Sequence, residues 1–301
     1  MVIEHIAGQK TGTTPSLGEA QVTEARSRRV WTSLRRSRVS LISAAYLVVI
    51  AALAVLAPVI THVDPNQQDL LNRLDPPSAQ HWLGTDEAGR DEYTRLVYGA
   101  RISLFIAICG TIGGLILGTL LGLVSGFFGG WVDNLAMRFV DILYAFPGIL
   151  LAILIVAFAG PSIWNLIFAL TVFGTPTLSR LVRAVVLTFK SQDFIEAARV
   201  AGATRTRIMF VHLLPNSLAP IIVYASLAAA GALLATAGLG FLGVGVQPPT
   251  AEWGSMLSTG QQYIREAQYL VIIPGVLIFL TVLAFNLIGD ALRDALDPRT
   301  R

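Results

Sequence analysis

Six long apolar runs constrain the fold of this chain more than any other feature of its sequence. Each run exceeds the roughly 20 residues that a helix needs to cross the ~30 Å hydrocarbon core of a bilayer. Because lipid offers no hydrogen bonds, a spanning segment must pair its own backbone groups, which favours α-helices. We therefore predict an all-α, polytopic membrane protein with six transmembrane helices. The runs cover residues 39–61, 102–126, 135–159, 162–185, 218–246 and 268–290.

The composition agrees with a membrane location, because 54% of the 301 residues are hydrophobic and only 14% are charged. Soluble domains carry about 25% charged residues. Several runs contain proline, which transmembrane helices tolerate where neighbouring helices satisfy the freed backbone groups. We expect kinked helices at Pro147, Pro176, Pro220 and Pro274.

Basic residues gather at both ends of the chain. Arg35, Arg36 and Arg38 precede the first run and Arg293 follows the last, so the positive-inside rule predicts that both termini are cytoplasmic. The expected organisation is a disordered leader at 1–38, a first transmembrane helix at 39–61, an extracytoplasmic loop at 62–101, a core of five transmembrane helices at 102–290 and a cytoplasmic tail at 291–301.

Several function classes find no support in the sequence. The net charge of +3 is explained by arginines that face the anionic inner leaflet, so we expect membrane lipid and no nucleic acid as a partner. The sequence holds no G-x-x-x-x-G-K-[ST] phosphate loop and no H-E-x-x-H zinc motif. Cys109 is the only cysteine, which rules out a disulfide within the chain and a cysteine metal cluster. We expect no catalytic residue, no cofactor and no metal site in this chain.

The cytoplasmic segment 192–216, QDFIEAARVAGATRTRIMFVHLLPN, has the pattern of a helical hairpin. Asp193 is expected to cap a first helix, with Glu196 three residues later as in a capping box. Gly202 predicts a break and Thr204 a new cap, after which the chain runs into the next apolar segment. On physical grounds alone, a hairpin that stiffens the link between the fourth and fifth helices is an equally good reading.

A resemblance to a known family bears on this segment. The stretch from Glu196 to Pro215 resembles the EAA loop of permease subunits from ATP-binding-cassette importers, although His212 stands where the broad family usually has Ile. The H-x-L-P-N form from His212 to Asn216 is similar to the branch that imports di- and oligopeptides, nickel or glutathione. The resemblance implies that the loop couples to an ATPase subunit through Glu196, Ala197, Ala198, Arg199, Gly202, Ala203, Leu214 and Pro215.

Four further segments resemble the same branch, and together the matches cover nearly everything after the leader. They are HWLGTDEAGRDEYTRLVYGARISL at 81–104, GFFGGWVD at 126–133, GFLGVGVQPPTAEWGSML at 240–257 and GDALRDALDPR at 289–299. The chain resembles the C-type permease of a peptide importer.

This resemblance implies a type I importer permease fold in the bacterial plasma (inner) membrane. It also implies a homologous second permease that completes the pore, two ATPase subunits that bind ATP and Mg, and an extracytoplasmic substrate-binding protein. The motifs leave the cargo open among dipeptide, oligopeptide, nickel and glutathione. A secondary transporter, which would need its own ion or proton relay, and a structural scaffold are the alternatives from other classes.

Three further features are open to more than one interpretation. A small-xxx-small series suits close helix packing, either within this bundle or at a permease dimer interface. Arg138 and Asp141 lie three residues apart at membrane depth, which favours a mutual ion pair or snorkelling over contact with cargo. The mixed charges of Thr85 to Arg101 predict a solvated, amphipathic surface helix, with Asp86 and Glu87 as contacts for the binding protein. The glycine series consists of Gly110, Gly114, Gly118, Gly122 and Gly126.

Overall fold

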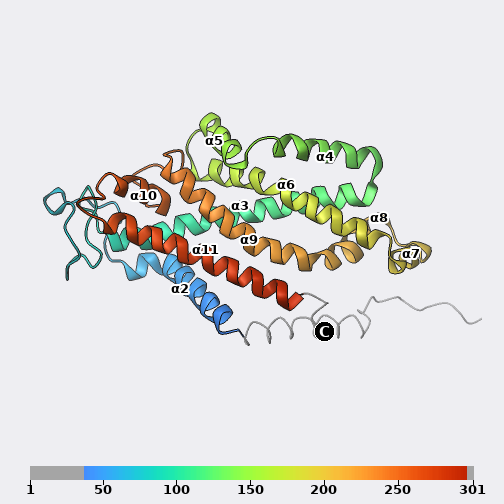
Figure 1. Ribbon diagram of the computed structural model, residues 1–301, viewed down its shortest axis with the longest axis horizontal. Coiled ribbons are helices and arrows are strands. Elements are labelled where there is room, and N and C mark those ends of the chain that lie inside the picture. The colour runs from blue at the N-terminus through green and yellow to red at the C-terminus, as the bar shows by residue number, and fades with distance from the viewer. Residues whose placement is uncertain (1–36, 297–301) are drawn as a thin grey trace, which may run out of the picture.

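A computed structural model describes residues 37–296 of the protein (Figure 1). The disorder predicted for the leader therefore lies outside the described residues, apart from the last two positions, and so does the end of the tail from residue 297. The regular elements of the described part are helical, which confirms the all-α prediction. They are α2 (Arg38–Ile60), η1 (Leu70–Asn72), α3 (Glu92–Phe128), α4 (Gly130–Tyr144), α5 (Gly148–Ala159), α6 (Ile163–Lys190), α7 (Asp193–Val200), α8 (Arg205–Arg207), the π-helix η2 (Ile208–Leu213), α9 (Leu214–Phe241), α10 (Trp253–Gln261) and α11 (Tyr269–Leu296).

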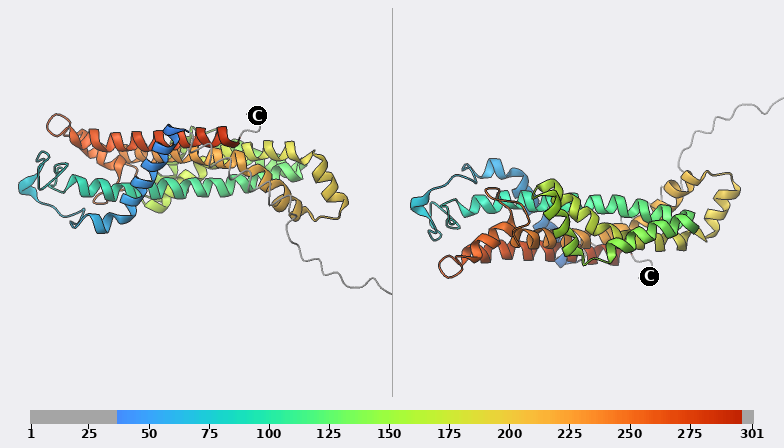
Figure 2. Two further views of the ribbon diagram at one scale, coloured as in Figure 1. Left: turned by 90° about the horizontal axis from the view of Figure 1, so that it is seen from below. Right: turned by 90° about the horizontal axis from the view of Figure 1, so that it is seen from above.

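Five helical stretches are long and apolar enough to cross a membrane: α2, α3, α6, the run from α8 to the end of α9, and α11. The pair α4–α5 makes a sixth span if it is counted as one. The long helices lie side by side along the long axis of the molecule, with α10 near one end and α7 at the other (Figures 1 and 2). The predicted six-span architecture is therefore confirmed, with one span broken.

The glycine series of α3 lies along α6. A side chain added at Gly110 would meet Leu170, one at Gly118 would meet Leu178, and one at Gly126 would meet Val186. Each partner stands 60 positions later in the sequence, so α3 and α6 run parallel with a constant register. Glycines let two backbones approach closely, which increases the dispersion contacts that hold helices together in lipid. The series is thus used inside this chain, and these glycines do not face outward toward a second permease.

The third predicted span, 135–159, is not the single kinked helix that the sequence predicted. It is divided into α4 and α5, whose axes differ by 85° across a short break. Pro147 lies at this break with an extended backbone, ψ 124°. Proline lacks an N–H and also disfavours helical geometry in the residue before it, so the helix ends here. Pro176, Pro220 and Pro274 remain inside continuous helices.

The loop that was predicted to be extracytoplasmic, 62–101, also differs from its prediction. α3 begins ten residues earlier than expected, at Glu92, with the Asp91 carboxylate accepting a hydrogen bond from the Thr94 N–H at 2.8 Å. The charges around it are not a solvated face, because Asp86, Arg90, Glu92 and Arg95 are all buried. A buried charge must be paired or hydrogen-bonded to be tolerated. Asp86 cannot therefore serve as a free contact for the binding protein.

Long-range contacts hold this charged cluster in place. The Asp86 carboxylate accepts from Arg90 at 2.6 Å and pairs with Arg95 at 3.1 Å. Arg95 also donates to the carbonyl oxygens of Pro65 at 3.1 Å and Pro249 at 3.2 Å, which lie in two different loops. The cluster ties the loop between α2 and α3 to the segment that leads into α10.

A second buried carboxylate, Glu252, joins α10 to α3. It caps α10 by accepting from the N–H groups of Gly254 at 2.9 Å and Ser255 at 2.8 Å, and it accepts from the Ser103 hydroxyl at 2.9 Å. Burial raises the pKa of the Glu252 carboxyl above its ordinary value, and these hydrogen bonds oppose the rise. Buried hydrogen bonds and ion pairs therefore hold the end of the bundle that carries α10, which we call the α10 platform.

The contact between α3 and α6 predicts that alanine substitution destabilises the protein at one glycine of the series and has little effect at another. A Cβ at Gly122 would overlap the Ser179 carbonyl and lie 2.8 Å from Val182, whereas a Cβ at Gly114 meets Gly174 at an ordinary 3.5 Å. Gly122→Ala should lower the free energy of unfolding by about 1–3 kcal/mol through overpacking. Gly114→Ala should change it little. Thermal unfolding of both purified variants tests this, and an equal loss at the two positions would contradict the parallel register.

Candidate functional site

The segment predicted to carry function forms the end of the molecule opposite α10 (Figure 1). α7 follows α6 after a two-residue turn. Gln192, and not Asp193, is the residue that precedes the helix, and its side chain makes no capping hydrogen bond. The predicted capping box is therefore wrong. Asp193 and Glu196 instead occupy the first turn of α7, where negative charge is favourable to the helix dipole.

The turn after α7 follows the sequence pattern. Gly202 has a φ of +79°, a conformation that glycine adopts without strain, so the predicted break is confirmed. The Thr204 hydroxyl accepts from the Arg207 N–H at 3.3 Å and caps α8, as predicted. The chain then continues without interruption through η2 into α9.

The LPN part of the motif explains the π-helical turn. Pro215 has no N–H to donate to the preceding turn, and the Leu214 N–H reaches back to the Met209 carbonyl, five residues earlier. The Asn216 side chain donates to the His212 carbonyl at 2.7 Å and so satisfies part of the disturbed backbone. Single π-turns of this kind are frequent at functional sites.

Apolar contacts fix this hairpin to the bundle. Ile195 of α7 is fully buried, and so is Leu213 of η2. Both belong to a core cluster that also contains Leu123 of α3 and Val182 of α6. The rings of Phe189 and Phe194 add an edge contact between α6 and α7, with centroids 6.4 Å apart. α7 is therefore packed against the adjoining ends of α3, α6 and α9.

The outer surface of the hairpin combines charge and small residues with a few exposed apolar side chains, of which Val200 is the most exposed. Val200 is 86% exposed at the end of α7, beside the exposed Arg199. An apolar side chain this open, surrounded by charged groups, suits contact with another protein. The sequence reasoning missed Val200 because a single valine carries no pattern. Of the predicted residues, Glu196, Ala197, Arg199, Gly202 and Pro215 are exposed, while Ala198, Ala203 and Leu214 are half-buried.

Two ion pairs join α4 to α6 near this end. Arg183 binds both carboxylate oxygens of Asp133, at 2.5 and 2.6 Å, and Arg180 binds Asp141 at 2.7 Å. The predicted pair between Arg138 and Asp141 is therefore wrong. Arg180 reaches Asp141 from the neighbouring helix and also lies 4.2 Å above the Tyr144 ring, which gives it a second favourable contact. Both α6 arginines are thus engaged by carboxylates of α4.

No group of three or more His, Cys, Asp or Glu side chains in residues 37–296 is arranged to hold a metal ion.

Comparison with known families gives a direct match. Residues 118–301 match the family described as binding-protein-dependent transport system inner membrane component. Residues 26–77 match the N-terminal transmembrane domain of oligopeptide transport permease C.

Curated relatives cover nearly the whole chain. It is 46% identical over 274 residues to the dipeptide transport system permease protein DppC of Alkalihalophilus pseudofirmus, covering 91% of this chain and 90% of the relative. It is 43% identical over 277 residues to the di/tripeptide transport system permease protein DppC of Pseudomonas aeruginosa, covering 90% and 91%. It is 44% identical over 275 residues to the glutathione transport system permease protein GsiD of Salmonella typhimurium, covering 91% of each.

A solved structure shares the fold. The chain has a TM-score of 0.55, at 22% identity, to an inward-facing conformation of the MetNI methionine ABC transporter, covering 67% of this chain and 96% of that one. This likeness supports the importer permease fold.

Opposite burial at two positions of α7 generates a prediction. Ile195→Ala removes a fully buried side chain and should destabilise the hairpin by about 2–5 kcal/mol. Val200→Ala, at an 86% exposed position, should stay within about 0.5 kcal/mol of the parent protein. Hydrogen exchange of the α7 amides measures the effect: exchange should accelerate in the first variant only. Acceleration in neither variant would show that α7 is not held by this core.

Proposed function

This chain belongs to the family of binding-protein-dependent transport system inner membrane components, and we propose that it passes di- or oligopeptides through the membrane as one half of an importer's pore. It is a permease subunit of an ABC importer and has no catalytic activity of its own. ATPase subunits and a binding protein are therefore its functional partners. The observation that carries the cargo assignment is the high identity to two dipeptide-system permeases over about nine-tenths of the chain.

Glutathione is the second candidate cargo. Relatives with that name are 43–44% identical to this chain, as close as one of the two dipeptide-system relatives. Glutathione is itself a tripeptide, so both candidates place a short peptide with charged ends in the same pathway. Uptake of a labelled dipeptide and of labelled glutathione by one reconstituted complex separates the two candidates.

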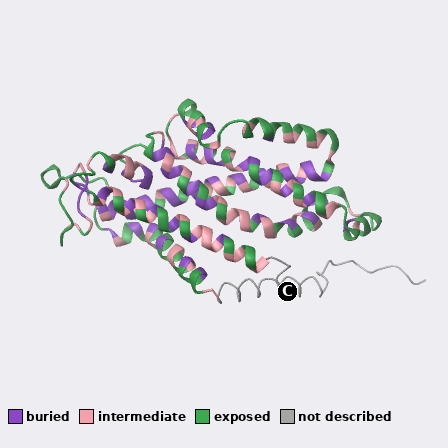
Figure 3. Ribbon diagram, viewed as in Figure 1, coloured by how far each residue is buried: buried purple, intermediate pink, exposed green. Residues whose placement is uncertain are grey.

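The proposed assembly contains a homologous second permease, two ATPase subunits on the cytoplasmic side and a binding protein on the opposite side. The exposed face of α4, which has only Val140 buried, supports a further contact in the membrane (Figure 3). In the proposed orientation, both termini lie in the cytoplasm. The α7 hairpin then lies beside the ATPases, and the α10 platform faces the binding protein.

Coupling to ATP follows from the rigidity of the hairpin. We infer that α7 seats on an ATPase subunit through Glu196, Ala197, Arg199 and the turn at Gly202. Because Ile195 and Leu213 are locked into the core shared with α3 and α6, movement of the ATPase would tilt these helices as a unit. Such rigid-body motion of packed helices is an established way to switch between two states.

A charge reversal on the exposed face tests this coupling. Glu196→Lys should abolish co-purification of the ATPase subunits, or their stimulation by loaded binding protein, because repulsion and lost contacts act at the docking surface. The matched control is Glu266→Lys, the same change at an exposed position in the loop before α11. Its ATPase association should remain unchanged.

Thermal unfolding of the isolated permease accompanies this experiment. Both variants should melt as the parent protein does, because neither side chain is buried. Normal coupling in Glu196→Lys would remove α7 from the docking surface, while leaving the permease assignment intact.

A further inference from the structure

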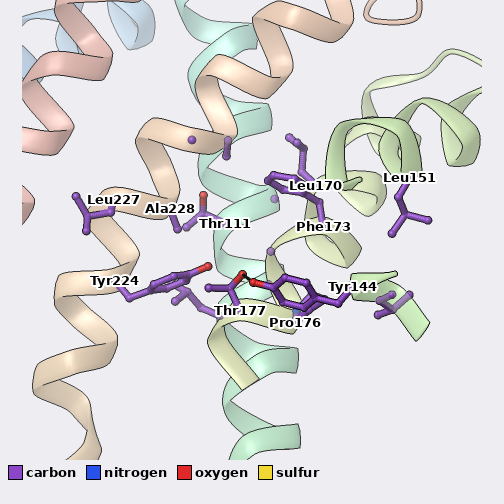
Figure 4. A pocket seen from close by; sticks show the side chains of 18 of the residues that line it. Thr111, Tyr144, Leu151, Leu170, Phe173, Pro176, Thr177, Tyr224, Leu227 and Ala228 are labelled. Atoms are coloured by element: carbon purple, nitrogen blue, oxygen red, sulfur yellow. Dashed lines mark hydrogen bonds between the residues drawn. The ribbon is translucent and has the colours of Figure 1, made fainter. Parts of the chain in front are cut away.

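A cavity of about 440 Å³ opens where α4 and α5 separate, with its other walls on α3, α6 and α9. Its volume falls within the roughly 300–1,000 Å³ range of small-molecule sites. The walls are mostly apolar, but three hydroxyl groups converge at one place (Figure 4). The Tyr144 hydroxyl lies 3.0 Å from the Thr177 hydroxyl, and the Tyr224 side chain points toward the same threonine from α9.

A second cavity, of about 570 Å³, extends from this point along α6, α9 and α11 toward their cytoplasmic ends. Tyr224 and Leu227 belong to the walls of both cavities. The two spaces therefore adjoin at these side chains, which form a wall of each. Arg293 of α11 lies at the cytoplasmic part of the second cavity.

Charged groups stand beside the hydroxyl cluster. The Asp141–Arg180 pair has side chains that are 57% and 47% exposed, and Arg180 lies on the ring of Tyr144. Arg180 is ten residues before the end of α6 and five residues before the end of the predicted span 162–185, which is about 7.5 Å at 1.5 Å per residue. Charged side chains within a span are costly against lipid and favour surfaces that water or protein covers. The exposed pair therefore favours water or protein over lipid on this face of the chain.

We propose that the two cavities form one translocation pathway for the cargo peptide, which the Tyr144, Thr177 and Tyr224 hydroxyls contact during passage. The proposal rests on the peptide-import function and adds the residues of its route. Hydroxyl groups can hydrogen-bond the amides of a short peptide, and the Asp141–Arg180 pair lies behind Tyr144, where Arg180 stacks on its ring. Apolar walls tolerate varied side chains, and weak contacts allow the cargo to leave.

Removing the two tyrosine hydroxyls while keeping the aromatic rings tests this translocation pathway. The complete importer is reconstituted in proteoliposomes with the Tyr144→Phe/Tyr224→Phe variant, and uptake of radiolabelled dialanine is measured beside ATP hydrolysis. Uptake should fall about five- to tenfold, whereas stimulation of ATP hydrolysis by loaded binding protein should persist. Tyr263→Phe, in the loop after α10, is the control and should transport normally.

Each other outcome has a distinct meaning. Unchanged uptake, or a parallel loss of uptake and ATPase stimulation, would contradict the proposed translocation pathway while leaving the importer function in place. A parent complex that hydrolyses ATP but takes up neither dialanine nor glutathione would overturn the proposed peptide function itself.

Thiol labelling provides an independent readout. In a Cys109→Ser background, Ala228→Cys places a thiol in the first cavity, and Val55→Cys places one on a 73% exposed position of α2. A water-soluble, membrane-impermeant thiol reagent added to the reconstituted complex should modify the thiol of Ala228→Cys and not that of Val55→Cys, and dialanine should slow the reaction. If neither thiol reacts, lipid or protein fills the cavity and the proposal is wrong.

Discussion

The parallel contact between α3 and α6 supports the rest of this structure. Lipid gives helices no hydrophobic reason to associate, so their contact must come from close backbone approach. The glycine series supplies it, with each glycine from Gly110 to Gly126 at the four-residue spacing lying against a residue of α6 that is 60 positions later. The α7 hairpin packs against one end of this helix pair through a shared apolar cluster. Both helices also contribute walls to the first cavity.

The broken span α4–α5 carries two acidic residues that form ion pairs with arginines of α6. Residues on both sides of the break line the first cavity. The two ion pairs hold α4 against α6 although the helix before the break buries little of its surface. A half-span held mainly by polar contacts can repack at lower cost than one locked into an apolar core, which is consistent with a wall that moves during transport.

Much of the architecture could be predicted from the sequence because the deciding interactions are local. Hydropathy located the spans, glycine spacing indicated a close helix contact, and Gly202 and Thr204 marked the turn of the hairpin. Local patterns failed where the partner is distant. Asp141 pairs with a residue 39 positions away instead of three, and Arg95 is held by carbonyl groups 30 and 154 positions away. A row of alternating charges looks the same whether it is solvated or buried. The presence of a proline also did not predict how far a helix bends, because only Pro147 of the four prolines interrupts its span.

The central claim is that α7 carries force between an ATPase subunit and the membrane helices. The most direct measurement introduces a photo-crosslinking amino acid at Val200, the most exposed large apolar side chain of the hairpin, in the native membrane. This account predicts a crosslinked product whose second component is identified by mass spectrometry as a P-loop ATPase. A side chain that forms crosslinks only with lipid, or with no partner while the importer is active, would contradict it.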